Sequence, residues 1–325
     1  MRRIIRNSLG WLLLLAPLHA LAASGTFSLV TENDAPYGAD RHYTNGFKMV
    51  WVPVLENGAP LWMQRTVRWM PWLPAGDIQY GYALGQSVFT PDDTKTDNPP
   101  ADARPYAGWL YLSSGIGIKS GRQLDQLGLT IGVIGRASLA DQSQKWMHRL
   151  LRVNHPEGWD TQLGNELGII VNGQRAWRGV LEADFSSSML DVSPFVGAAA
   201  GNVFTHASGG WIIRYGQRLP DDFGPPRIDP ASPGSASLSP KDGIGWYVFA
   251  GLEGRLVLRN LFLDGNTFRD SRSVDKRYLV GDLQFGLVVD WLNVRLAYTH
   301  IIRSREFETQ ENADQFGAFS VMWKL

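Results

Sequence analysis

The stretch QFGAFSVMWKL, Gln315–Leu325, alternates between two kinds of side chain. Large apolar residues occupy every second position from Phe319 to Leu325, and the positions between them include Ser320 and Lys324. Because successive side chains of a strand point to opposite sides, one face of this strand is apolar and aromatic. A strand with an apolar outer face and an aromatic or large apolar end is typical of a transmembrane β-barrel. The alternative is a half-buried strand of an exported soluble protein.

Segments of strand length recur along the rest of the chain. They include TFSLVTEN, GFKMVWVPV, YGYALGQSVFT, YAGWLYLSSGIGI, LGLTIGVIGR, GWYVFAGLEGRL, YLVGDLQFGLVVDW and NVRLAYTHIIR. Counting gives about twelve strands, an even number as in bacterial barrels. An odd number would leave the two chain ends on opposite sides of the membrane, so Asn165–Leu190 is interpreted as one long, bent strand. The sequence therefore predicts an all-β fold, an antiparallel transmembrane β-barrel of about 12 strands.

Composition excludes several classes of protein. The 325 residues include 31 basic and 31 acidic side chains, so the formal net charge is zero and no affinity for nucleic acid is expected. Charged residues make up 19% of the chain, against about 25% in soluble domains. There is no cysteine, which excludes thiol catalysis, cysteine metal sites and disulfides.

The N-terminus has the pattern of an export signal. Three arginines lie within the first seven residues, an apolar run follows at Leu9–Leu18, and Ala20-Leu21-Ala22 has the form of a cleavage site. The apolar run is shorter than the roughly 20 residues of a helical membrane span, which disfavours a single membrane anchor. We therefore predict a signal peptide at 1–22, one barrel domain at 23–325, and secretory export to the bacterial outer membrane.

Strand parity gathers three polar loops at one rim. With both termini in the periplasm, the first strand rises and ends near Asn33, so Asp34–His42, Thr90–Arg104 and Ala137–Gly164 are predicted to be external loops. An active site is expected at this extracellular rim. The long link Leu55–Gly76 is then periplasmic, and its stretch LWMQRTVRWMPW predicts a short amphipathic helix at the inner membrane interface.

The first external loop and its flanks are rich in oxygen donors. Asn33 and Asp34 end one strand and Thr44 begins the next, so these positions can be neighbours across a hairpin. Carboxylate and amide oxygens suit a hard cation such as calcium, although EF-hand spacing is absent. The alternative is a polar turn capped by Asx-type hydrogen bonds.

The other two loops add cations and a histidine. Lys95 and Arg104 in the second loop are candidates for binding anionic groups of a substrate, particularly phosphates. In the third loop, ADQSQKWMHRLLRV, Ala140–Val153, has helical periodicity, and Gln144 and His148, four residues apart, point the same way. A histidine that is neutral near pH 7 can accept a proton as a general base.

Together, these motifs resemble a known family. In order, they are Asn33-Asp34, DRHYTNG (Asp40–Gly46), QSVFTPDD (Gln86–Asp93), RPYAGWLY (Arg104–Tyr111), Q-x-x-x-H (Gln144–His148), GWDTQLGNE (Gly158–Glu166), IIRYGQRLPDDFGPP (Ile212–Pro226) and LFLDGNTFRDS (Leu261–Ser271). The joint order and spacing resemble those of the outer-membrane lipid A 3'-O-deacylases, the LpxR family, over most of the mature chain.

The resemblance implies a twelve-stranded barrel that uses calcium to hydrolyse the 3'-ester-linked acyloxyacyl chain of lipid A. Carried over by motif, the active-site positions are Asn33, Asp34, Thr44 and His148, with Gln144 beside them. His148 would act as general base, and calcium near Asn33 and Asp34 would polarise the ester carbonyl. Ala35 departs from the family pattern, in which a second acidic residue can follow Asn-Asp.

The expected partners follow from this substrate. Arg41, Lys95 and Arg104 are expected to hold the glucosamine phosphates of lipid A, or lipopolysaccharide, in the outer leaflet. The acyl chains would lie against the outer wall of the barrel, in the membrane. We expect a monomer.

Two alternatives remain open. The segment His42–Gly46 also looks like the H-x-S-N-G motif of outer-membrane phospholipase A, with Thr44 in the place of serine and His42 as its partner. The second alternative is a passive porin or structural barrel. In that case the rim charges only bind lipopolysaccharide or line a pore.

Overall fold

The computed structural model describes residues 24–34, 41–55, 58–70, 72–151, 156–224 and 243–325. The predicted signal peptide and Ala35 lie outside these residues. The strands are β1 (Gly25–Asn33), β2 (His42–Pro53), β3 (Asp77–Thr90), β4 (Ala107–Ser120), β5 (Gln123–Ile134), β6 (Glu166–Trp177), β7 (Leu181–Phe185), β8 (Ser188–Gly201), β9 (Phe204–Gln217), β10 (Ile244–Asn260), β11 (Leu279–Trp291), β12 (Val294–Arg303) and β13 (Asp314–Lys324). The helices are α2 (Leu61–Arg68), α3 (Ala140–Leu151) and α4 (Leu261–Asp264), with 3-10 turns η2 (Gly135–Ser138) and η3 (Gly158–Thr161).

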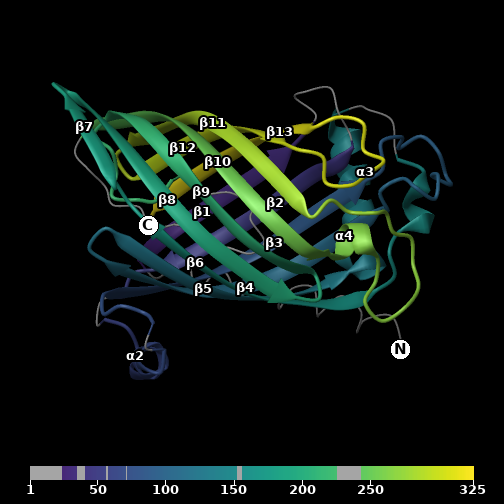
Figure 1. The fold of residues 1–325 in the computed structure, drawn as a ribbon, viewed down its shortest axis with the longest axis horizontal. Coiled ribbons are helices and arrows are strands. Elements are labelled where there is room, and N and C mark those ends of the chain that lie inside the picture. The colour runs from purple at the N-terminus through teal and green to yellow at the C-terminus, as the bar shows by residue number, and fades with distance from the viewer. Residues whose placement is uncertain (1–23, 35–40, 56–57, 71, 152–155, 225–242) are drawn as a thin grey trace, which may run out of the picture.

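The strands close into an antiparallel barrel, as predicted. Each strand of the ring pairs with its neighbours in sequence, and the β1–β13 and β6–β8 pairings complete the circle. Of the 13 strands in the sheet, β7 pairs with the lower part of β8 and stands beyond the ring, which leaves 12 in the barrel. Figure 1 shows the tilted wall, with α3 and α4 at one end and α2 and β7 at the other.

The interpretation of Asn165–Leu190 as one bent strand was wrong. The segment contains β6, β7 and the first residues of β8. Gly179, between β6 and β7, has a φ of 57°, a left-handed conformation that interrupts a strand. Because β7 pairs with β8 below the β6–β8 ladder, it runs toward the periplasm in the same direction as β6. The number of times the ring crosses the membrane therefore stays even.

The alternation of side chains explains which face meets lipid. In β13, Phe319 is 48% exposed, while Ser320 and Met322 are buried. In β10, Val248 and Leu252 are exposed and Tyr247 and Phe249 are buried. The apolar residues therefore cover the outer wall, as a bilayer requires. Among the helices in the described part of the chain, none is long and apolar enough to cross a membrane.

The lumen is filled rather than open. Its outer half holds a buried aromatic cluster that includes Trp109, Tyr111 and Phe262, and the rings of Phe89 and Phe262 stack with centroids 4.1 Å apart. Near the periplasmic end, Asp222 from the segment after β9 lies between two buried arginines, Arg214 of β9 and Arg295 of β12. Packed side chains and paired charges thus block the interior at both levels.

The helix α3 lies in the third external loop, as predicted, and packs on the outer wall of the barrel. A close approach at Gly108 of β4 allows this, because a Cβ there would come within 2.1 Å of the Ala140 Cβ and 2.2 Å of the Ser138 Oγ. Only glycine leaves room for the start of α3 at this point.

We predict that Gly108→Ala loosens α3 from the wall, since the added methyl group cannot fit without a shift of Ala140. Tryptic cleavage after Lys145 or Arg149 in detergent-solubilised protein should become faster. Gly117→Ala is the matched control on the same strand, because its Cβ would meet its nearest neighbour, the Leu124 side chain, at an ordinary contact distance of 3.7 Å. Equal cleavage rates in both variants would contradict this account.

Candidate active site

A β-bulge brings together two of the predicted site residues. The register between β2 and β3 shifts at Thr44, between Tyr43 and Asn45, and bulges of this kind re-aim a side chain. The Asn33 Nδ2 donates to the Thr44 carbonyl oxygen at 3.1 Å. The Thr44 hydroxyl lies 2.7 Å from the hydroxyl of Thr90, at the end of β3. Thr44 and Thr90 are both buried, so three strands contribute to one polar cluster.

Thr90 was missed by the sequence interpretation. Thr90 is identified by the register between β2 and β3, which pairs it with His42 across the bulge. The sequence of one strand does not show how that strand is aligned with its neighbour.

Asp34 is fixed at the end of the same hairpin. Its Oδ2 accepts a hydrogen bond from the Arg41 backbone N–H at 2.8 Å, and the side chain is buried. A cavity of about 190 Å³ adjoins it, lined also by Arg41, Tyr43, Asp314 and Phe316, among others. The described ends of the first loop therefore enclose a small, charged hollow at the rim.

The helix α3 approaches this cluster from outside the barrel. Ala140, Gln144 and His148 are spaced by four residues, so they share one helix face, and all three are buried. Ala140 packs with Val88 of β3 and with Trp159. Val88 and Thr90 lie on the same side of β3, because side chains two apart share a face. The helix face that carries Gln144 and His148 is thus turned toward the outer wall, with His148 about 12 Å along the axis from Ala140.

Gln144 is held from a second loop segment. Its Oε1 accepts a hydrogen bond from the indole Nε1 of Trp159, in η3, at 2.8 Å. Since an indole N–H only donates, this bond fixes which end of the Gln144 amide is oxygen. The other end of the amide is then the Nε2, which can only donate hydrogen bonds.

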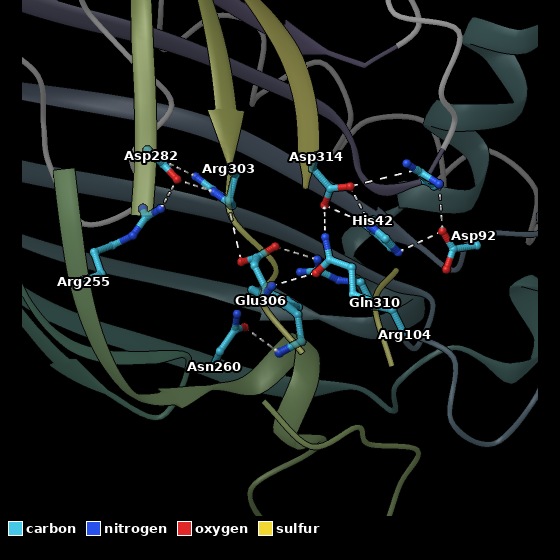
Figure 2. Close-up of polar contacts among 12 residues, drawn as sticks. His42, Asp92, Arg104, Arg255, Asn260, Asp282, Arg303, Glu306, Gln310 and Asp314 are labelled. Carbon is cyan, nitrogen blue, oxygen red and sulfur yellow. Dashed lines mark hydrogen bonds and ion pairs between the residues drawn. The ribbon is translucent and has the colours of Figure 1, made fainter. Parts of the chain in front are cut away.

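His42 has a different environment from the one expected of a catalytic partner for Thr44. Its Nδ1 lies 2.7 Å from the Asp314 Oδ1 and its Nε2 lies 3.1 Å from the Asp92 Oδ1, as Figure 2 shows. The backbone at His42 has a φ of 61°, which is uncommon for a residue with a side chain. Both ring nitrogens thus face carboxylates, and the Thr44 hydroxyl faces Thr90 instead.

Ion pairs with buried carboxylates, Asp282 and Glu306, continue from His42 across the outer mouth (Figure 2). Asp282 pairs with Arg255 at 2.7 Å and with Arg303 at 2.9 Å. Glu306 accepts from Arg104 at 2.9 Å and lies 3.8 Å from Arg303. Gln310 joins the two halves, accepting from the Glu306 backbone N–H at 2.7 Å and donating to Asp314 at 3.1 Å.

The electrostatics of the loops follow from these contacts. Burial by itself raises the pKa of Glu306, but the guanidinium groups of Arg104 and Arg303 outweigh it and hold that pKa below its ordinary value. The hydrogen bond from His42 lowers the pKa of Asp92. Both carboxylates are therefore ionised at neutral pH.

The three predicted substrate-binding cations have different surroundings. Lys95 is exposed on the second loop, and its backbone N–H donates to the Asp93 Oδ1 at 2.9 Å. Arg41 is half-buried, 3.5 Å from Asp92. Arg104 is 1% exposed, over the Phe89 ring and paired with Glu306, so its contacts hold the mouth of the barrel together.

The donor set beside Asp34 is of the kind that a hard cation takes. The Asn33 Nδ2 donates to Thr44, so the oxygen is the acceptor end of that amide, and the next residue in the chain, Asp34, adds a buried carboxylate. Amide and carboxylate oxygens suit calcium. Within the described ranges, no group of three or more His, Cys, Asp or Glu side chains could hold a metal.

A closed barrel with an apolar outer wall, a filled lumen and a polar cluster on the outer rim defines a class: an outer-membrane β-barrel whose chemistry lies at its surface. A family model described as outer membrane protein LpxR matches residues 9–325. The chain therefore belongs to the LpxR family, as the motifs predicted, and is an outer-membrane enzyme that modifies lipid A.

The solved structure of an LpxR protein supports the fold. LpxR from Salmonella typhimurium superimposes with a TM-score of 0.74 at 19% identity, covering 92% of this chain and 100% of that one. The β-domain of the Bordetella autotransporter BrkA gives a TM-score of 0.45 at 10% identity, covering 93% and 99%. The outer-membrane enzyme PagL gives 0.26 at 14% identity, covering 49% and 90%. No curated protein matches the sequence.

We predict that Glu306→Gln destabilises the barrel at neutral pH. Removing one partner of a buried ion pair costs about 3–5 kcal/mol. Here Arg104 would lose its carboxylate, while Arg303 would keep Asp282. Because the pKa of Glu306 is depressed in the folded state, its contribution is present above the unfolded pKa and is lost as the pH falls through the folded pKa. The free energy of unfolding in urea should therefore be lower for Glu306→Gln than for wild type at pH 7, and the two values should converge in acid.

Glu308→Gln provides the control for this substitution. Glu308 pairs with Arg277 at 2.7 Å but is 57% exposed, so its loss should change the unfolding free energy by less than about 1 kcal/mol. A difference between Glu306→Gln and wild type that does not depend on pH would refute the ionic origin of the effect.

Proposed function

We propose that this protein is a calcium-dependent hydrolase that removes the 3'-ester-linked acyloxyacyl chain from lipid A. The observation that supports this most is the position of α3. It turns Gln144 and His148 toward the outer wall, on the side of β3 that carries Thr90 and its partner Thr44. A polar cluster on that wall faces the outer leaflet, where the ester of lipid A lies, so the substrate need not leave the membrane.

His148 serves as the general base in this proposal. It takes a proton from a water molecule that attacks the ester carbonyl, a role that requires a neutral imidazole. Gln144, whose oxygen accepts from Trp159, lies one helical turn before His148 and would orient the histidine or the substrate. Thr44 and Asn33, tied to each other by a hydrogen bond, position the acyl carbonyl.

Asn33 and Asp34 would hold the calcium ion, which supplies positive charge for the oxygen of the tetrahedral intermediate. Lys95 and Arg41, on the first two external loops, would bind the phosphates of the disaccharide. Arg104 contributes through the network that supports these loops.

The two alternatives are disfavoured on specific grounds. The phospholipase mechanism needs His42 to accept a proton from Thr44, but its ring nitrogens face Asp314 and Asp92. A porin needs an open lumen, whereas Trp109, Tyr111 and Phe262 fill the outer half of this one.

We predict that cells expressing the wild-type chain lose one acyloxyacyl unit from lipid A, and that cells expressing His148→Ala do not. Loss of a general base lowers the rate about 10²- to 10⁴-fold. Mass spectrometry of extracted lipid A, with and without a calcium chelator, measures this. His206→Ala on β9 is a control that should leave the product unchanged.

Two outcomes would overturn the mechanism. Covalent labelling of Thr44 by a fluorophosphonate would show a nucleophilic threonine instead of an activated water. Full activity of the purified protein after chelation would remove calcium from the reaction.

A further inference from the structure

The link between β2 and β3 lies against the outer wall at the periplasmic end. Ile118 of β4, Asp125 of β5 and Arg175 of β6 are paired across the sheet. Asp125 shares its face of β5 with Leu129 and Ile131, which are exposed to the membrane side. Yet Ile118 and Asp125 are only 1% and 4% exposed. A segment of the chain therefore covers this part of the wall.

The covering segment is fastened by specific contacts. The Arg175 Nε donates to the Asp125 Oδ1 at 2.6 Å, and its Nη2 donates to the Trp72 carbonyl oxygen at 2.8 Å. A Cβ at Gly76 would lie 2.3 Å from the Lys119 carbonyl oxygen, so the link passes directly against β4. Figure 1 shows α2 outside the barrel, at the end opposite α3.

The free side of this segment is rich in aromatic and basic residues. Trp69 is 86% exposed, Leu61 67% and Trp72 64%, and Arg65 and Arg68 are exposed beside them. Tryptophans with neighbouring cations are typical of the bilayer interface, where the rings enter the acyl boundary and the cations meet phosphates.

A cleft of about 720 Å³ lies between α2 and the lip of the barrel. Its lining combines aliphatic side chains, among them Val52, Val67 and Ile78, with the cations Arg68 and Lys324. Among the described residues of the lining, Asp77 is the acidic one, so these residues together carry an excess of positive charge. That combination fits a phosphate with an acyl chain attached.

We propose that α2, Trp69, Trp72 and this cleft form a phospholipid-binding site that docks the periplasmic rim onto the inner leaflet of the outer membrane. The occupant follows from position and charge. The segment covers the lipid-facing wall of an outer-membrane barrel, on the periplasmic side, and the cleft pairs two cations with an aliphatic lining. The inference stands apart from the catalytic proposal, and its tests do not use activity.

The chain has no cysteine, so a single introduced thiol can report depth. The full-length protein carrying Trp69→Cys, spin-labelled and reconstituted in phosphatidylethanolamine–phosphatidylglycerol vesicles, should be accessible to oxygen and protected from a water-soluble nickel chelate. Asp184→Cys, on the exposed hairpin strand β7, is the control and should show the reverse. If the spin label at position 69 is as accessible to the nickel chelate as the label at position 184, the lipid-binding proposal is wrong. That result would indicate a surface for a periplasmic partner instead.

The headgroup contacts are tested by native mass spectrometry with phosphatidylglycerol as the probe. The double variant Arg68→Gln, Lys324→Gln should bind it roughly thirty-fold more weakly, at about fivefold per cation near an anionic surface. Arg149→Gln, exposed on α3 at the opposite rim, should bind as wild type does. Equal binding by the double variant and wild type would overturn the assignment of the cleft.

Discussion

A sheet that crosses a bilayer can leave no backbone N–H or C=O unpaired within the hydrocarbon, and in this chain the pairing of β1 with β13 meets that requirement. The pairing joins the two ends of the described chain in an antiparallel ladder. It fixes which strands rise and which descend, and it fixes which face of each strand meets lipid. The positions of the polar loops follow from it, because each loop joins a rising strand to a descending one.

Inside this frame, the loops at the outer mouth are held by charge. Arg104 and His42 are buried and Arg303 is 14% exposed, and each of these cations or potential cations faces a carboxylate. Such pairs add little net stability compared with an apolar core, but losing one partner is severe. Their effect is therefore to specify one arrangement of the loops around Asp34 and Thr44. The filled lumen below gives that arrangement a rigid base.

Much of the architecture could be predicted from the sequence. Alternation in segments such as the last eleven residues indicated the strands, and parity placed the third loop with its helix at the rim. The local pattern of Asn33, Asp34 and Thr44 indicated a cluster across a hairpin. The predictions for metal and catalytic roles remain predictions.

Other features could not be predicted, for physical reasons. His42 and Asp314 are 272 positions apart, and Arg104 and Glu306 are 202 apart, so their pairing depends on closure of the barrel and not on local pattern. The bulge at Thr44 depends on the register of two strands. The break at Gly179 depends on one backbone conformation, which is why β7 was merged with β6.

The filled lumen has a consequence for the cell that carries this protein. An open barrel adds a leak for ions and small solutes with every copy inserted, so its abundance is limited by the permeability that the envelope tolerates. Here, aromatic side chains occupy the outer half of the interior, and Asp222 with its two arginines occupies the periplasmic half. Each inserted copy should therefore add less leak than an open barrel with the same number of strands.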